Sequence, residues 1–158
     1  AITYDEFLKV GKDRLPQDLF RDATHHIASL DLKAELIIAG FISLAPEIYI
    51  TDESGKVRAM EDFAVIGEGS YLAHSSLMRR GQVSARSLEH TLYNVYEAKR
   101  YAEAVGSVGP STTILVISEG NAMRFVGEAA SNHLAELYKK YGPRETPSEL
   151  HFPSVFDE

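Results

Sequence analysis

The stretch DFAVIGEGSYLAHSSLMRRG, residues 62–81, changes its periodicity halfway along. An apolar run over residues 63–66 leads into the Gly-Glu-Gly turn of residues 67–69, and behind the turn apolar residues recur at helical spacing. This pattern predicts a strand, a tight turn and then a helix over about 70–80. We expect both turn glycines to supply positive φ, and Gly81 to end the helix in the same way.

A glycine turn in front of a helix also occurs in loops that bind nucleotide phosphates. A dinucleotide loop needs a third glycine three residues after the second, where this chain has Leu72, and a P-loop needs Gly-Lys before Ser or Thr. We therefore interpret Gly67, Glu68, Gly69 and Ser70 as a structural or pocket-lining turn. The Glu68 carboxylate is expected to cap the positive end of the helix dipole.

Composition limits the class of protein and its partners. A chain of 158 residues with 44% hydrophobic residues is typical of one globular domain. Its net charge of −7 would repel a polyanion, so no nucleic acid partner is expected. The apolar runs are too short to span a membrane and no secretory leader opens the chain, which favours a cytoplasmic protein without a membrane partner. Because the chain has no cysteine, disulfides and thiolate chemistry are excluded.

The first third of the chain predicts two helices and then a meander of strands. Thr3 and Glu6 have the spacing of a capping box, and Gly11 and Pro16 are expected to divide the first helix from a second that ends near Ala28. Strands are expected over about 33–41, 47–51 and 56–67, the first of them buried. Their connections are too short for crossovers, so the strands should be antiparallel.

The rest of the chain completes an α+β pattern. Ser84 is expected to open a helix over 85–105, followed by a strand over 112–118 and a last helix from about Met123 to Tyr141. Because helices and strands do not alternate, an antiparallel sheet with the helix pair on one face is predicted. Residues 1–142 should form a single domain, and residues 143–158 an extended C-terminal tail that packs on nothing.

Taken together, these motifs resemble the C-terminal half of a proteasome-family (20S alpha/beta-type) subunit, in the N-terminal-nucleophile hydrolase superfamily. The resemblance covers residues 31–119 and rests on AELIIAGF, PEIYITDESGKV, DFAVIGEGSYLAHSSL, VSARSLEHTLYNVYEAKRYAEAVG and PSTTILVIS in that order. It implies the family's four-layer sandwich, helices over two sheets over helices, with the N-terminal strands missing. It also implies peptide-bond hydrolysis without a cofactor.

The same resemblance implies an N-terminal threonine whose hydroxyl attacks the peptide while its amine accepts the proton. Thr3 does not fit that role because it opens a helix, and nothing upstream of Leu32 resembles the strands that carry the nucleophile. Glu68 stands where active subunits have a serine, and Val105 and Val108 stand at the positions of an aspartate and a serine. We therefore expect no catalytic residue in this chain.

Two functions remain open from the sequence. The chain is either a proteasome-like subunit that is incomplete or non-catalytic, or a non-enzymatic assembly or ligand-binding α+β module. Runs such as ELIIAGF and TTILVIS are apolar on both faces, and the chain offers few elements to cover them. The expected partner is therefore a complementary N-terminal segment or further copies in a homo-oligomer.

Other candidate chemistry gives a weaker signal. His25 and His26 are adjacent, so on a helix they point about 100° apart, and no metal site is expected. Ser75 and Ser76 lack the Gly-x-Ser-x-Gly setting of a hydrolase nucleophile. The tyrosines of the second long helix are interpreted as covering its surface rather than lining a ligand groove.

Overall fold

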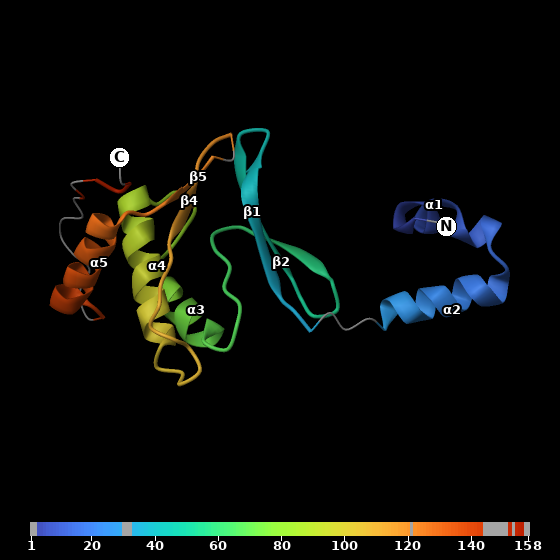
Figure 1. Cartoon of the computed structure of the whole chain (residues 1–158), viewed down its shortest axis with the longest axis horizontal. Helices are drawn as coiled ribbons and strands as arrows, with labels where there is room; N and C mark the ends of the chain where they lie inside the picture. Colours follow the sequence, from blue (N-terminus) through green and yellow to red (C-terminus); the bar gives the residue numbers. More distant parts are fainter. Residues whose placement is uncertain (1–2, 30–32, 121, 144–151, 153, 157–158) are drawn as a thin grey trace.

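The computed structural model describes residues 3–29, 33–120, 122–143, 152 and 154–156. It confirms the predicted α+β class. In chain order the elements are α1 (Tyr4–Arg14), α2 (Gln17–Ala28), β1 (Leu36–Ile42), β2 (Ala45–Thr51), β3 (Val57–Met60), α3 (Ser70–Arg79), α4 (Leu88–Ala102), β4 (Leu115–Ile117), β5 (Met123–Phe125) and α5 (Glu128–Tyr141). The strands form two antiparallel sheets rather than one, of order β1-β2-β3 and β4-β5 (Figure 1).

Helices α1 and α2 form a hairpin that stands to one side of the other elements (Figure 1). The capping box is confirmed: the Thr3 backbone N–H donates to the Glu6 carboxylate at 3.0 Å, and the Thr3 hydroxyl accepts from the Glu6 N–H at 3.3 Å. The expected break at Gly11 is wrong, because α1 runs through it. A Cβ there would lie 3.1 Å from the Phe7 ring and 3.2 Å from the Phe20 ring, so glycine lets the two helices approach.

The β1–β2 hairpin has a regular register, from Leu36 opposite Thr51 to Ile42 opposite Ala45. Its two-residue turn has φ of +50° at Ser43 and +72° at Leu44, the signs of a turn that follows the twist of the strands. Strand β1 is present as predicted, but it is not buried. The exposed fraction is 53% for both Leu36 and Ile38 and 56% for Ile42.

The predicted strand over 56–67 is right only as far as Met60. Residues 61–69 leave the sheet and form an irregular connection to α3. Asp62 holds this connection, because its carboxylate accepts a hydrogen bond from the Ser84 N–H at 2.9 Å. The apolar run over residues 63–66 therefore packs toward α3 and α4 instead of pairing with a strand.

Helices α3 and α4 lie side by side (Figure 1). Backbone and side-chain hydrogen bonds mark where α3 ends and where α4 begins. Gly81 has φ +59°, and the N–H of Gln82 donates to the Leu77 carbonyl at 3.0 Å, so Gly81 ends α3 as predicted. The expected start of α4 at Ser84 is wrong. Ser87 is the N-cap instead, and its hydroxyl accepts from the His90 N–H.

The hydrophobic core lies between α4, α5 and β4. Its buried members are Leu92, Tyr93, Tyr96, Ala130, Leu134, Leu137 and Phe152, with Ile114 and Val116 packed against them. Met123 does not begin the last helix, because residues 123–125 pair with β4 as the strand β5, and α5 starts at Glu128. The C-terminal tail was expected to pack on nothing, which is wrong for Phe152, because this side chain belongs to the hydrophobic core. The other residues of the tail from 144 to 151, together with 153 and 157–158, lie outside the described residues.

Candidate functional site

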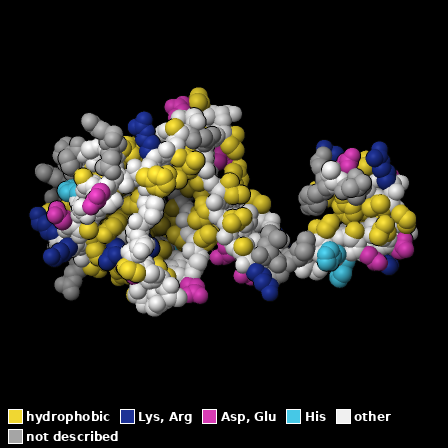
Figure 2. All heavy atoms as spheres, viewed as in Figure 1, with side chains coloured by type: hydrophobic (Ala, Val, Ile, Leu, Met, Phe, Trp, Pro, Cys, Tyr) yellow, Lys and Arg dark blue, Asp and Glu magenta, His cyan; other side chains and the backbone are white. Residues whose placement is uncertain are grey.

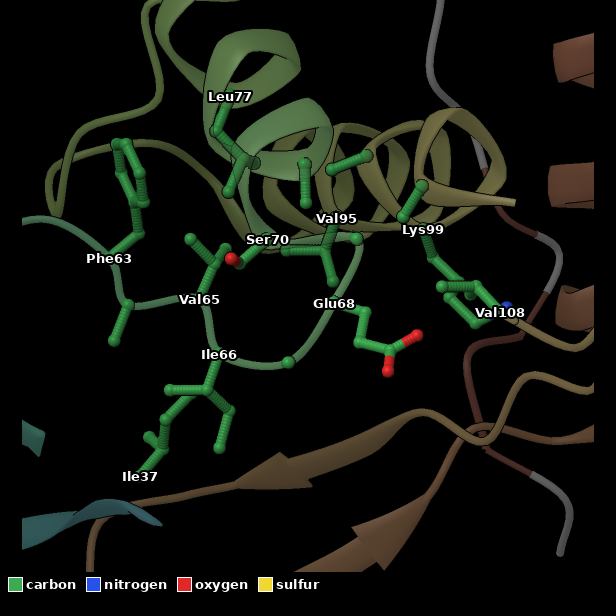
Figure 3. Close-up of a pocket in the computed structure, with 16 residues that line it drawn as sticks. Ile37, Phe63, Val65, Ile66, Glu68, Ser70, Leu77, Val95, Lys99 and Val108 are labelled. Atoms are coloured by element: carbon green, nitrogen blue, oxygen red, sulfur yellow. The ribbon is translucent and has the colours of Figure 1, made fainter. Parts of the chain in front are cut away.

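The turn of residues 67–70 lines a cavity of about 510 Å³ between β1, the connection before α3, and the α3–α4 pair (Figure 3). Most of its lining is apolar, including Ile37 from β1 and Val95 from α4. The charged or hydroxyl side chains on its wall are those of Glu68, Ser70 and Lys99. The pocket-lining interpretation of the turn is therefore compatible with its position, and whether it binds anything stays a prediction.

The two glycines of the turn are required for different reasons. Gly67 has φ +89°, as expected, and a Cβ there would meet open space. Gly69 has φ −85°, so the expectation of positive φ is wrong at this position. A Cβ on Gly69 would lie 2.7 Å from the Ala102 Cβ and 3.0 Å from a Val108 methyl. Gly69 therefore allows the start of α3 to approach the end of α4 closely.

Glu68 does not cap α3, contrary to expectation. The N-cap of this helix is Gly69, and no side chain accepts a hydrogen bond at that end. Figure 3 shows the Glu68 side chain extending from the turn into the open space beside Val108. A different carboxylate contacts the turn, since Glu35 accepts a hydrogen bond from the Gly67 N–H at 3.5 Å. Glu68 thus adds a carboxylate to a wall that is apolar apart from Ser70 and Lys99.

Lys99 is a pocket residue that sequence reasoning missed. Its ammonium donates to the Glu103 carboxylate at 2.8 Å and to the Gly109 carbonyl at 2.7 Å. The Lys99 and Glu103 spacing of four residues on a helix is the sequence signal that could have indicated the pair. Because both acceptors hold the ammonium, Lys99 ties the loop after α4 to the helix.

The structure brings together only some of the residues that the proteasome resemblance singled out. Val108 lines the same cavity as Glu68, and its N–H donates to the Val105 carbonyl at 2.9 Å. Val105 is not among the lining residues. Thr3 lies on the far side of the molecule, at the start of α1, well away from the turn (Figure 1).

A buried ion cluster joins α3 and α4, the two helices that contribute to the cavity lining. The fully buried carboxylate of Glu97 on α4 accepts hydrogen bonds from Arg79 at 2.6 Å and from Arg80 at 2.9 and 2.5 Å. The Ser76 hydroxyl adds a fourth bond at 3.3 Å. The two arginines at the end of α3 therefore hold this helix to α4.

Tyr93 lies beside this cluster, with its ring beneath Arg80. Its hydroxyl is buried and has no hydrogen-bond partner. Burial raises the pKa of this hydroxyl to about 12, and the negative charge of Glu97 acts in the same direction. Tyr93 is therefore a neutral residue of the hydrophobic core, whereas the sequence predicted that it covers the helix surface.

A second cavity of about 440 Å³ separates the three-stranded sheet from the segment before α4. One face of the sheet lines it through Ala39, Phe41, Ile48 and Met60. Alternate residues of a strand share a face, so Ile37 in the first cavity belongs to the same face as Ala39 and Phe41. The sheet thus faces the helices across two hollows instead of packing on them.

The described residues contain no group of three or more His, Asp or Glu side chains arranged to hold a metal ion. None of the helices described is both long and apolar enough to cross a bilayer. A scan of the chain against models of protein families matches none of them. A search among curated proteins finds no match either.

Proposed function

We propose that this chain is a proteasome-like subunit of the N-terminal-nucleophile hydrolase superfamily that does not itself catalyse hydrolysis. The observation that carries the proposal is the corner at Gly67 and Gly69, which seats α3 against the end of α4 beside a hollow facing the sheet. This corner, the hairpin before it and the helix pair after it occur in the order that the resemblance implies.

The cavity supports a non-catalytic role. Attack on a peptide carbonyl needs a nucleophile with a proton acceptor in hydrogen-bond reach. Of the lining residues, Ser70 is the only hydroxyl, and the Lys99 ammonium is directed to Glu103 and Gly109 instead. Next to the turn, Val108 contributes a methyl group, which can neither attack a carbonyl nor accept a proton. The proposed role is therefore structural: the chain supplies a helix layer and one sheet to a larger assembly.

In that assembly, we expect a complementary segment to enter between the sheet and the helices. The two hollows of about 510 and 440 Å³ lie on the face of the sheet that points at α3 and α4. Filling them would remove Ile37 and Val95 from water, which are 40% and 42% exposed. Burying a fully exposed side chain of this size is worth about 1.5–3 kcal/mol, so covering the part of each that is still exposed would contribute roughly 0.6–1.3 kcal/mol.

Hydrolysis of short fluorogenic peptides tests the catalytic half of this proposal. The purified chain is expected to release no more fluorophore than buffer, and Thr3→Ala is expected to change nothing. Activity that Thr3→Ala abolishes would show that Thr3 is a nucleophile. Electron microscopy of the same sample tests the assembly half, since a proteasome-like subunit should appear in ring-shaped particles, and isolated small particles at all concentrations would contradict it.

A second candidate is a ligand-binding module, which the apolar cavity at Glu68 favours. A pocket of this size, apolar apart from Glu68, Ser70 and Lys99, suits a small apolar ligand with a basic or hydroxyl end that Glu68 could bind. Thermal melting with long-chain amines and with matched fatty acids separates the two candidates. A rise of Tm with the amines that Glu68→Gln removes would favour the ligand-binding module, and no rise would favour the assembly role.

A further inference from the structure

The α1–α2 hairpin carries a cavity of its own, apart from the two hollows beside the sheet. Its volume is about 560 Å³, within the range of pockets that bind small molecules. Figure 2 shows hydrophobic side chains gathered on this hairpin. The lining comes from the last turn of α1 and from residues of α2 that recur at helical spacing and so share one side of the helix. The lining residues are Lys12, Gln17, Phe20, Arg21, Thr24 and His25.

Ring stacking holds the apolar part of this cavity in place. Phe20 lines the cavity, and its ring stacks on the buried ring of Phe7, with 5.0 Å between the ring centroids. Gly11 allows the two helices to approach in this way, because a Cβ there would lie 3.1 Å from the Phe7 ring and 3.2 Å from the Phe20 ring. The aromatic surface of the cavity is therefore fixed by contacts within the hairpin.

The charged side chains of the lining are cations. Lys12 and Arg21 are positively charged at neutral pH, the His25 imidazole adds a further N–H donor, and no Asp or Glu belongs to the lining. Among the residues that the structure describes, no carboxylate lies within ion-pair distance of Lys12. Arg21 contacts Asp22 at 3.5 Å in a surface pair whose side chains are 78% and 71% exposed. Such a pair contributes little, so both cations can bind another anion.

We propose that this cavity binds an amphiphilic carboxylate, a small molecule with one carboxylate on an apolar body. The carboxylate would lie between Lys12 and Arg21, whose guanidinium can donate two parallel hydrogen bonds to it. The apolar body would cover the Phe20 ring. A concave site with an apolar surface and a few polar groups that fix the orientation is typical of small-molecule binding.

The charge of the chain makes this position distinct. A net charge of −7 repels anions from the surface as a whole, whereas this cavity combines two cations with an aromatic ring. The pocket at Glu68 has the opposite polarity and was considered above for amines. The proposal does not depend on a proteasome-like function, because the hairpin lies outside residues 31–119, which carry that resemblance. Either proposal can fail without affecting the other.

Isothermal titration of the full chain with octanoate at low ionic strength tests the site. A single octanoate should bind, and Lys12→Gln combined with Arg21→Gln should weaken binding by about tenfold or more. Arg14→Gln combined with Arg58→Gln is the matched control, since it removes two positive charges from exposed residues outside the cavity and should leave the affinity nearly unchanged. Equal circular dichroism spectra would show that both variants fold like the unmodified chain.

Matched ligands test the two halves of the recognition. Acetate has the charge without the apolar body, and octanol has the apolar body without the charge, so each should bind about tenfold more weakly than octanoate or less. Octanoate that does not bind, equal weakening by the two double variants, or acetate or octanol binding as tightly as octanoate would overturn the proposal. An acidic peptide that shifts the amide resonances of residues 17–25 where octanoate does not would assign the cavity to a protein partner instead.

Discussion

The helical layer of α3, α4 and α5 and the sheet of β1, β2 and β3 use similar apolar residues, but they bury them very differently. Leu92 and Leu134 are 4% and 0% exposed, whereas Ile38 and Ile42 are 53% and 56% exposed. Figure 2 shows hydrophobic side chains gathered on the surface over the sheet. The helical layer closes its own core within this chain, while the sheet leaves much of its apolar surface exposed.

Within the helical layer, the buried ion cluster should give the largest single effect. Glu97→Ala would leave Arg79 and Arg80 without the carboxylate that both contact inside the α3–α4 pair. Removing one partner of a buried ion pair lowers the free energy of unfolding by about 3–5 kcal/mol. Urea denaturation measures the loss, with the exposed Glu136→Ala as the control that should change stability by no more than about 0.5 kcal/mol.

Matched truncations in the two regions test the comparison itself. Leu92→Ala removes a buried side chain and should lower the free energy of unfolding by about 2–5 kcal/mol. Ile38→Ala removes an exposed one, so the stability of a dilute sample should change by about 0.5 kcal/mol or less. If urea titration of dilute protein gave equal losses in the free energy of unfolding for the two variants, the sheet would be as well packed as the helical layer.

Alanine substitutions at two glycines test the close contact between Gly69 and Ala102. Gly69→Ala places a Cβ 2.7 Å from the Ala102 Cβ, and Ala102 has no flexible end that could move away. Overpacking of this kind costs about 1–3 kcal/mol. Gly106→Ala is the control, because its Cβ would meet nothing within 4 Å. A thermal unfolding midpoint that falls equally in both variants would contradict the proposed contact.

The smallest expected effect concerns Tyr93 and alkaline pH. Its pKa of about 12 in the folded protein lies above the ordinary value of 10.0. The unfolded chain therefore loses this proton first, and the stability that Tyr93 contributes below pH 10 is lost as the pH rises from about 10 to about 12. Tyr93→Phe should remove one late step from the ultraviolet titration of tyrosinate; the same late step in the variant would contradict this assignment.

The sequence predicted those parts of the fold that local chemistry determines. The capping box at Thr3, the positive φ of Gly67 and the helix end at Gly81 all follow from nearest neighbours, and the structure confirms them. The strand predicted over 56–67 ends at Met60, because a run of four apolar residues has the same pattern whether it pairs with a strand or packs on a helix. The burial of β1 was wrong because an apolar strand does not reveal whether its own chain covers it.

The candidate site could be predicted only in part for the same reason. The turn and Val108 line one cavity and Gly69 approaches Ala102 closely, although these residues lie far apart in the chain. The cluster at Glu97 joins α3 to α4, and its residues lie at least 17 positions apart in the sequence. No local pattern predicts which carboxylate two neighbouring arginines will bind.

Hydrogen exchange at a series of protein concentrations tests most directly whether an assembly covers the sheet. Exchange of backbone amides reports the protection of each strand and helix separately. The amides of β1 should exchange more slowly as the protein concentration rises, whereas those of α4 should not change. Fast exchange of β1 at every concentration, in a species that stays at 17.5 kDa, would contradict the account.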